Sequence, residues 1–133
     1  MSLAVVFKML VVWAVILVLA MANGFLREAV LIPALGKSGG MLSSGLILSC
    51  IILIVAYLSL PWFGFLGGTK FIALGLGWLL LTLTFEFSFG FLRGRALSEI
   101  LEAYTFKDGN IWTLVLLVTA ISPWLAAKLK GFL

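Results

Sequence analysis

One acidic side chain lies inside an apolar stretch that otherwise carries no charge. Glu86 interrupts residues 71–92, and Arg93 follows it seven positions later. On a helix this spacing separates the two residues by about 10 Å along the axis and places them near one face. A carboxylate at such a depth is costly unless it is paired, protonated or hydrated. Glu86 is therefore the first candidate for a group that binds a proton, an ion or a polar substrate.

The residues around Glu86 support two interpretations. In the functional one, Glu86 binds the cation, proton or polar group, Arg27 tunes its charge, and Asn23 and Ser88 supply further polar contacts. In the structural one, Glu86 and Arg27 form a buried ion pair that holds the first and third helices together. The two interpretations are compatible, because an ion pair can position a site and also exchange a proton.

A group of basic residues follows Glu86 along the chain. Arg93 and Arg95 precede residues 97–105, and Lys107 comes after them. Guanidinium groups match phosphate oxygens in geometry, so these residues are candidates for contact with a lipid headgroup. Ordinary anchoring at a membrane surface is the stronger explanation, because basic residues commonly flank spanning segments.

Four apolar stretches must position these side chains, at about residues 3–26, 41–62, 71–92 and 110–127. Each is close to the length of about 20 residues with which a helix crosses a bilayer. They must be helices, because lipid satisfies no backbone polar group. Of the 133 residues 64% are hydrophobic and 11% are charged, which is too apolar for a soluble fold. The sequence predicts an all-α, integral membrane four-helix bundle formed by a single transmembrane domain, residues 1–133.

The first apolar stretch has a second interpretation. Lys8, the apolar run after it and Ala20-Met21-Ala22 resemble a signal peptide with an A-x-A cleavage site. The run is longer than a typical apolar region of a signal peptide, which favours a spanning helix. Because no proline occurs before Pro33, this helix is expected to continue to about residue 32 and to carry Asn23 and Arg27 on one face.

Residues 95–105 form an amphipathic segment. Apolar side chains recur there at spacings of three and four, with polar side chains opposite: Leu97, Ile100, Leu101 and Tyr104 against Ser98, Glu99 and Glu102. This pattern is typical of a helix that lies in the membrane interface. A simple extension of the third span is the alternative.

Two further features predict local packing. Trp13 and Trp78 fall inside spans and are expected to pack between helices. Pro123 should bend the fourth span near its end, because proline removes a helical hydrogen bond. Ser122 is then placed to bond the carbonyl oxygen that proline leaves free.

The composition excludes several kinds of chemistry. The chain has no histidine and one cysteine, Cys50, which argues against haem, the common zinc sites and histidine-based triads. No cofactor, metal or catalytic residue is predicted, and the chain is not expected to be an enzyme. A lipid-headgroup enzyme that uses Glu86 and the arginines is the least favoured hypothesis. The net charge of +4 suits an anionic membrane surface and does not indicate a nucleic-acid partner.

The charges do not select an orientation. With four spans, one side of the membrane carries four basic residues and the other five: Lys8, Lys70, Lys128 and Lys130 against Arg27, Lys37, Arg93, Arg95 and Lys107. The positive-inside rule needs a bias between the two sides. Either the rule is weak for this chain, or both orientations are inserted and form an antiparallel homodimer.

Short motifs occur in order along nearly the whole chain: N-G-x-x-R-E from residue 23, T-F-E-F-x-F-G from residue 84, I-W-x-L-V-L-L from residue 111 and P-W-L-A-A-x-L from residue 123. In these motifs the chain resembles an uncharacterised family of small bacterial four-helix inner-membrane proteins. The resemblance implies a multi-pass protein of the bacterial inner (cytoplasmic) membrane, and it implies no catalytic activity.

Two functions remain as predictions. The first is a transport- or channel-like protein that acts as a homo-oligomer, because four helices of this length enclose little space alone. Glu86 would be its intramembrane ion, proton or polar-substrate group. The second is a non-catalytic accessory or assembly subunit of a larger membrane complex.

Overall fold

The computed structural model describes residues 2–64, 66–106 and 109–132. Within these residues the chain is helical and contains no strand. The elements are α1 (Leu3–Leu26), a π-helical segment η1 (Arg27–Leu31), α2 (Ile32–Phe63), α3 (Gly68–Leu92), α4 (Leu97–Leu101), a 3-10 turn η2 (Glu102–Tyr104) and α5 (Trp112–Lys130). The all-α prediction is confirmed, and the predicted bounds of the long helices agree closely with the observed ones, except at the start of α2.

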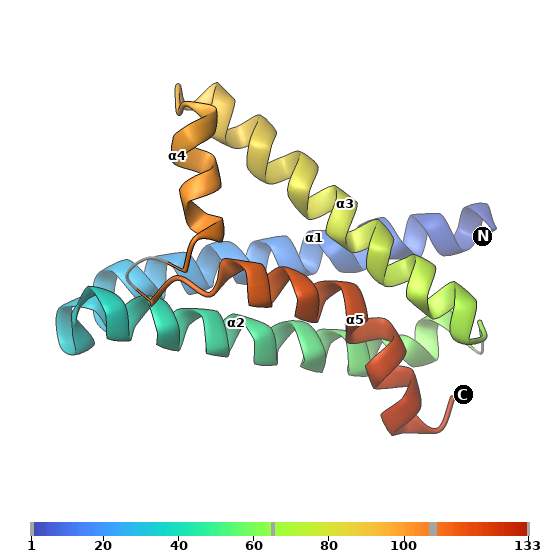
Figure 1. Ribbon diagram of the computed structural model, residues 1–133. Coiled ribbons are helices and arrows are strands. Elements are labelled where there is room, and N and C mark those ends of the chain that lie inside the picture. The colour runs from blue at the N-terminus through green and yellow to red at the C-terminus, as the bar shows by residue number, and fades with distance from the viewer. Residues whose placement is uncertain (1, 65, 107–108, 133) are drawn as a thin grey trace.

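The first two long helices form a hairpin that turns at Gly36. Helical hydrogen bonding continues past residue 32, as predicted, but Gly36 leaves the helical conformation with φ 81° and ψ 171°. Glycine adopts this conformation readily because it has no Cβ atom. The remainder of α2 then returns along α1 (Figure 1). A Cβ atom on Gly40 would collide with Ile32, so a glycine is also needed where the two arms meet.

The long helices have the dimensions of membrane spans. Three helical runs are long and apolar enough to cross a membrane: Leu3–Phe63, Gly68–Leu92 and Trp112–Lys130. The first run folds back at Gly36, so the described part of the chain contains four long helices. Their outer surfaces carry large apolar side chains, among them Val18 and Leu58.

The core lies where α5 packs against α2 and the first half of α3. Its largest fully buried side chains are Trp78 and Phe71. The indole N–H of Trp78 donates to the carbonyl oxygen of Met9 at 3.1 Å, and the indole N–H of Trp13 donates to the hydroxyl of Thr82 at 3.1 Å. Both tryptophans therefore link α1 to α3, which confirms that they pack between helices.

Helix α5 bends in its second half, which contains Pro123 (Figure 1). Proline has no N–H to donate to the carbonyl oxygen of Thr119 four residues earlier. The Ser122 hydroxyl donates to that oxygen at 2.9 Å. The predicted replacement of the lost hydrogen bond is confirmed.

The second half of α3 leans away from α1 (Figure 1). Buried side chains occupy the first half of the helix, whereas after Trp78 only Gly90 is buried among its described residues. Gly94, with φ 78°, follows the helix end, and α4 then returns from the end of α3 toward the other helices and packs Ile100 against Gly90. The amphipathic segment is therefore a separate short helix and not an extension of the third span.

Candidate functional site

A cavity of about 960 Å³ lies between the second half of α3, α4 and the neighbouring parts of α1, α2 and α5. The buried part of its wall includes the apolar side chains of Ile16, Leu48, Ile52 and Val115 beside the polar ones of Asn23, Ser44 and Thr119. Charged residues of both signs line the rest of the wall: Arg27, Glu28, Lys37, Glu86, Arg93, Arg95, Glu99 and Glu102. The lean of α3 creates this space, because a helix that followed α1 closely would fill it.

The Glu86 carboxylate lies half-buried on the cavity wall and joins three elements. Its Oε2 atom accepts a hydrogen bond from the phenol O–H of Tyr104 at 2.8 Å and another from the indole N–H of Trp112 at 2.8 Å. Tyr104 belongs to η2, and Trp112 is the first residue of α5. Among the described residues no donor reaches Oε1. Glu86 is thus held by two uncharged donors, and one oxygen remains open to a ligand.

Tyr104 fixes the end of the α4–η2 segment against α3. Its ring stacks on Phe87 with ring centroids 6.4 Å apart and planes 7° apart. Burial, together with the hydrogen bond to Glu86 and the negative charge of that residue, raises the pKa of Tyr104 to about 12. The phenol therefore stays protonated and continues to donate at any physiological pH.

The Tyr104 contact gives a direct spectroscopic prediction. The chain has two tyrosines, so in a Tyr57→Phe background the tyrosinate absorbance reports Tyr104 alone. The titration midpoint is expected at about 12, and Glu86→Gln should lower it, because the nearby negative charge is removed. The folded-state pKa of Tyr104 lies above the ordinary value of 10.0. The contribution of Tyr104 to stability is therefore fully present below pH 10.0. The contribution is lost as the pH rises toward 12. An unshifted midpoint in both proteins would contradict the contact.

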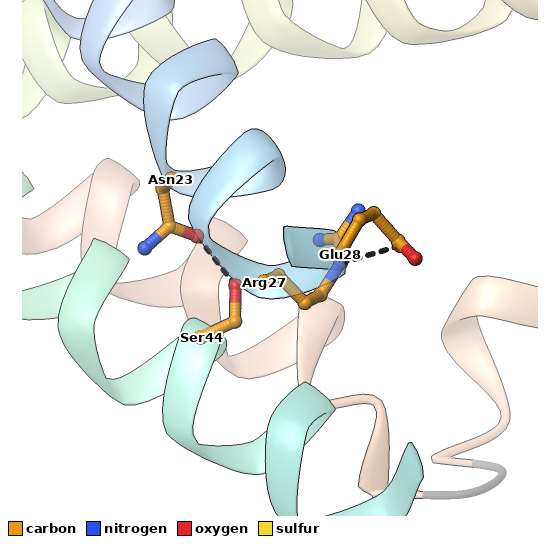
Figure 2. A network of polar contacts seen from close by, with 4 residues as sticks. All are labelled: Asn23, Arg27, Glu28 and Ser44. Carbon is orange, nitrogen blue, oxygen red and sulfur yellow. Dashed lines mark hydrogen bonds and ion pairs between the residues drawn. The ribbon is translucent and has the colours of Figure 1, made fainter. Parts of the chain in front are cut away.

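Arg27 pairs with its neighbour and not with Glu86. Its Nε atom lies 3.2 Å from Oε1 of Glu28, and both side chains line the cavity. The predicted buried ion pair between Glu86 and Arg27 is therefore not formed. The reason is geometric, since the second half of α3 leans away from α1 and uncharged donors from η2 and α5 reach the carboxylate. Figure 2 shows two separate contacts in this region, the Arg27–Glu28 ion pair and the hydrogen bond between Ser44 and Asn23.

Asn23 contributes an unused hydrogen-bond donor to the site. Its side chain is only 4% exposed, and its Oδ1 accepts a hydrogen bond from the Ser44 hydroxyl at 2.5 Å (Figure 2). Its Nδ2 atom is buried and has no partner among the described residues. Asn23 lines the same cavity as Glu86. A buried donor without a partner is uncommon in proteins, so water or a ligand acceptor is expected at this position.

Two other predicted residues occupy the mouth of the cavity. The guanidinium group of Arg93 lies over the ring of Phe89, 5.4 Å from its centroid. Arg95 pairs with Glu99, with Nε and Oε2 3.9 Å apart. Both arginines are exposed, as anchoring residues would be.

One predicted contact is corrected by the structure. Ser88 is exposed on α3 and does not line the cavity. It follows Glu86 by two residues, a rotation of about 200° on a helix, which directs it to the opposite face. Lys107, the third basic residue of the predicted headgroup contact, lies outside the described residues.

Sequence analysis missed Tyr104 and Trp112 as partners of Glu86. Tyr104 belongs to the apolar stripe of the amphipathic segment, and the structure leaves it partly buried, with its hydroxyl on Glu86. Trp112 begins the fourth long helix, where an indole group commonly faces the headgroup layer. No local signal in the sequence connects this residue to a carboxylate 26 positions earlier.

The site thus contains one half-buried carboxylate, a buried amide donor without a described partner, and aromatic and apolar walls. No protein-family model, curated protein or solved structure matches this chain. The resemblance to small inner-membrane proteins therefore stays a prediction. The described residues include no group of three or more metal-ligating side chains. The arrangement can bind a proton, a cation or a polar group at Glu86.

Proposed function

We propose that this chain is a multi-pass protein of the bacterial inner membrane whose four long helices span the bilayer. Their length and apolar composition support this, as does the placement of basic and aromatic side chains that are typical of headgroup layers. Both termini lie at one end of the bundle (Figure 1). Lysines pack on aromatic rings at this end: Lys8 on Trp62, Lys128 on Trp124 and Lys130 on Tyr57.

The protein is transport- or channel-like, and Glu86 is its ion, proton or polar-substrate group. One observation carries this proposal: Glu86 lines a cavity of about 960 Å³ and is held there by two uncharged donors without a basic partner among the described residues. An ionisable residue inside a spanning helix is a functional candidate by default. A purely structural carboxylate at this depth would be expected to pair with a cation, and Arg27 pairs elsewhere. Asn23 offers a polar substrate a second contact.

The functional unit is a homo-oligomer. The second half of α3 buries little of its surface within one chain, so a second copy can cover it and close the cavity. The nearly equal basic charges of the two ends suit an antiparallel dimer. A single cysteine added after the last residue in a Cys50→Ala background reports the orientation in intact cells. Labelling of about half of the protein by an impermeant thiol reagent supports two orientations. Labelling of all of the protein, or of none, contradicts two orientations.

Ion flux in reconstituted vesicles tests the proposed function. Vesicles that contain a pH-sensitive dye are given an inside-negative potential with potassium and valinomycin, and the dye reports proton entry. Wild-type protein is expected to accelerate entry well beyond the rate of protein-free vesicles. Parallel vesicles report Na⁺ and K⁺ uptake. Rates equal to those of empty vesicles for all three cations would contradict transport of protons, Na⁺ and K⁺ by this protein.

An accessory role is the alternative, and one feature favours it. The end of α3 exposes Phe91 at 53% and Leu92 at 85%, beside the exposed apolar side chains Leu97 and Leu101 of α4. A helix from a different membrane protein could cover this area as well as a second copy can. Purification from native membranes separates the alternatives, because an accessory subunit is expected to be unstable without its partner.

A further inference from the structure

We infer that the cavity binds an amphiphilic organic cation, a molecule with an alkylated or delocalised positive charge and apolar substituents. The inference rests on the proposed role of Glu86 as the binding group, and it adds the chemical class of the substrate. Three properties of the cavity wall carry it: a row of aromatic rings, a carboxylate with no basic partner among the residues that the structure describes, and a buried apolar surface.

Aromatic side chains share the cavity wall with the carboxylate. Trp13, Phe85, Phe89 and Trp112 line the same cavity as Glu86. Trp13 and Phe85 meet edge to face with centroids 6.2 Å apart, and Phe85 stacks on Phe89 with centroids 5.4 Å apart. Aromatic faces attract cations, and organic ammonium ions are commonly bound in this way. The chain already places one cation on this row, because the Arg93 guanidinium group lies over Phe89.

The charges of the wall favour a cation at the level of Glu86. The lining residues include four basic and four acidic side chains, so the wall as a whole is balanced. Arg27 pairs with Glu28, and Arg95 pairs with Glu99, so two of the four positive charges are neutralised by neighbours. Glu86 instead accepts hydrogen bonds from Tyr104 and Trp112, which carry no charge. Its negative charge is therefore left for a ligand.

The apolar wall selects against small hydrated ions. Ile16, Leu48, Ile52 and Val115 border the cavity and belong to its most buried side chains. Divalent cations such as Ca²⁺ and Mg²⁺ require several oxygen ligands, and the described residues include no group of three or more metal-ligating side chains. A cation with apolar substituents is stabilised by both the carboxylate and the walls, because its substituents leave water on binding.

Two ions of the same shape and opposite charge test this inference. Tetraphenylphosphonium and tetraphenylborate are added separately to purified full-length protein in detergent, and binding is measured by calorimetry against protein-free micelles. We expect saturable binding of tetraphenylphosphonium and none of tetraphenylborate. Glu86→Gln should weaken phosphonium binding about tenfold or more, the loss of one charge interaction. Glu28→Gln removes the same charge from a residue already paired at the cavity, and it should change the affinity less than threefold.

Equal binding of the two ions, or equal affinity in Glu86→Gln and wild type, overturns the inference. The comparison of the two ions needs no variant, so it decides the matter even if Glu86→Gln does not fold. If the protein conducts protons in vesicles but does not bind phosphonium, the substrate class is rejected and the proposed function is unaffected. Glu86-dependent phosphonium binding without proton, Na⁺ or K⁺ flux supports the binding site and rejects transport of those three cations.

Discussion

Glu86→Gln is expected to reduce cation flux through reconstituted vesicles to the rate of protein-free vesicles. The substitution removes the negative charge and the titratable proton, and it keeps nearly the same side-chain volume. The glutamine carbonyl oxygen can still accept the hydrogen bonds of Tyr104 and Trp112. Hydrogen bonds to a charged group are worth about 1.5–3 kcal/mol and neutral ones about 1 kcal/mol. Over the two bonds the fold should therefore lose about 1–4 kcal/mol, and part of this is offset because a neutral amide costs less to bury than a carboxylate.

Activity and stability must be measured on the same preparation. Helical content and thermal unfolding in detergent give the stability, and dye-loaded vesicles give the flux. Glu99→Gln is the matched control, because it removes an equal charge from an exposed residue of the same cavity. It should retain most of the flux. Flux in Glu86→Gln equal to that of wild type would exclude Glu86 from the pathway. If flux falls only in proportion to the fraction of protein that is unfolded, Glu86 is a structural residue.

Gly75→Val is expected to disrupt the contact between α3 and α5. Gly75 is buried, and a Cβ atom there would collide with the backbone carbonyl group of Ala120 and approach Cδ of Pro123 to 3.2 Å. Backbone atoms of a packed helix cannot move aside as a flexible side chain can. Overpacking a core costs typically about 1–3 kcal/mol and more where the backbone must shift. Valine should destabilise the protein by about 2 kcal/mol or more, measured by SDS-induced unfolding followed by circular dichroism.

Gly77→Ala is the control two residues further along α3. A Cβ atom at Gly77 would meet the thioether of Met9, which is the flexible end of a long side chain. Alanine also favours a helix over glycine by about 1 kcal/mol. The change should lie within about 1 kcal/mol of wild type. If Gly75→Val unfolds at the same SDS concentration as Gly77→Ala, the close approach of α3 to α5 is not required for stability.

The sequence predicts the helices well because their signals are local. Apolar runs, Pro33 and the glycines after it determine where α1 and α2 are divided, and the exact turn occurs at Gly36. The bond between Ser122 and Thr119 was also predictable, since a proline frees the carbonyl oxygen four residues earlier. Such features depend on residues within one or two helical turns of each other.

The site was predicted only in part because its contacts depend on the tilt of one helix. Glu86 and Asn23 were identified by their types and positions, and both line the cavity. The partners of Glu86 were not identified, because Tyr104 and Trp112 reach it only when the second half of α3 leans away from α1. The same lean removes the expected contact with Arg27. Residue spacing along the chain gives no information on that angle.

The π-helical segment at Arg27–Leu31 has a consequence for the phase of the first helix. A π-helical turn contains one residue more than an α-helical turn, which shifts all later side chains by about 100° relative to those before it. The face formed by Val12, Ile16 and Asn23 therefore changes direction where the helix passes through this segment. Side chains before and after the π-helical segment therefore follow two helical phases that differ by about 100°. Deletion of one residue within the segment would rotate the hairpin turn about the helix axis, rather than simply shorten the rod.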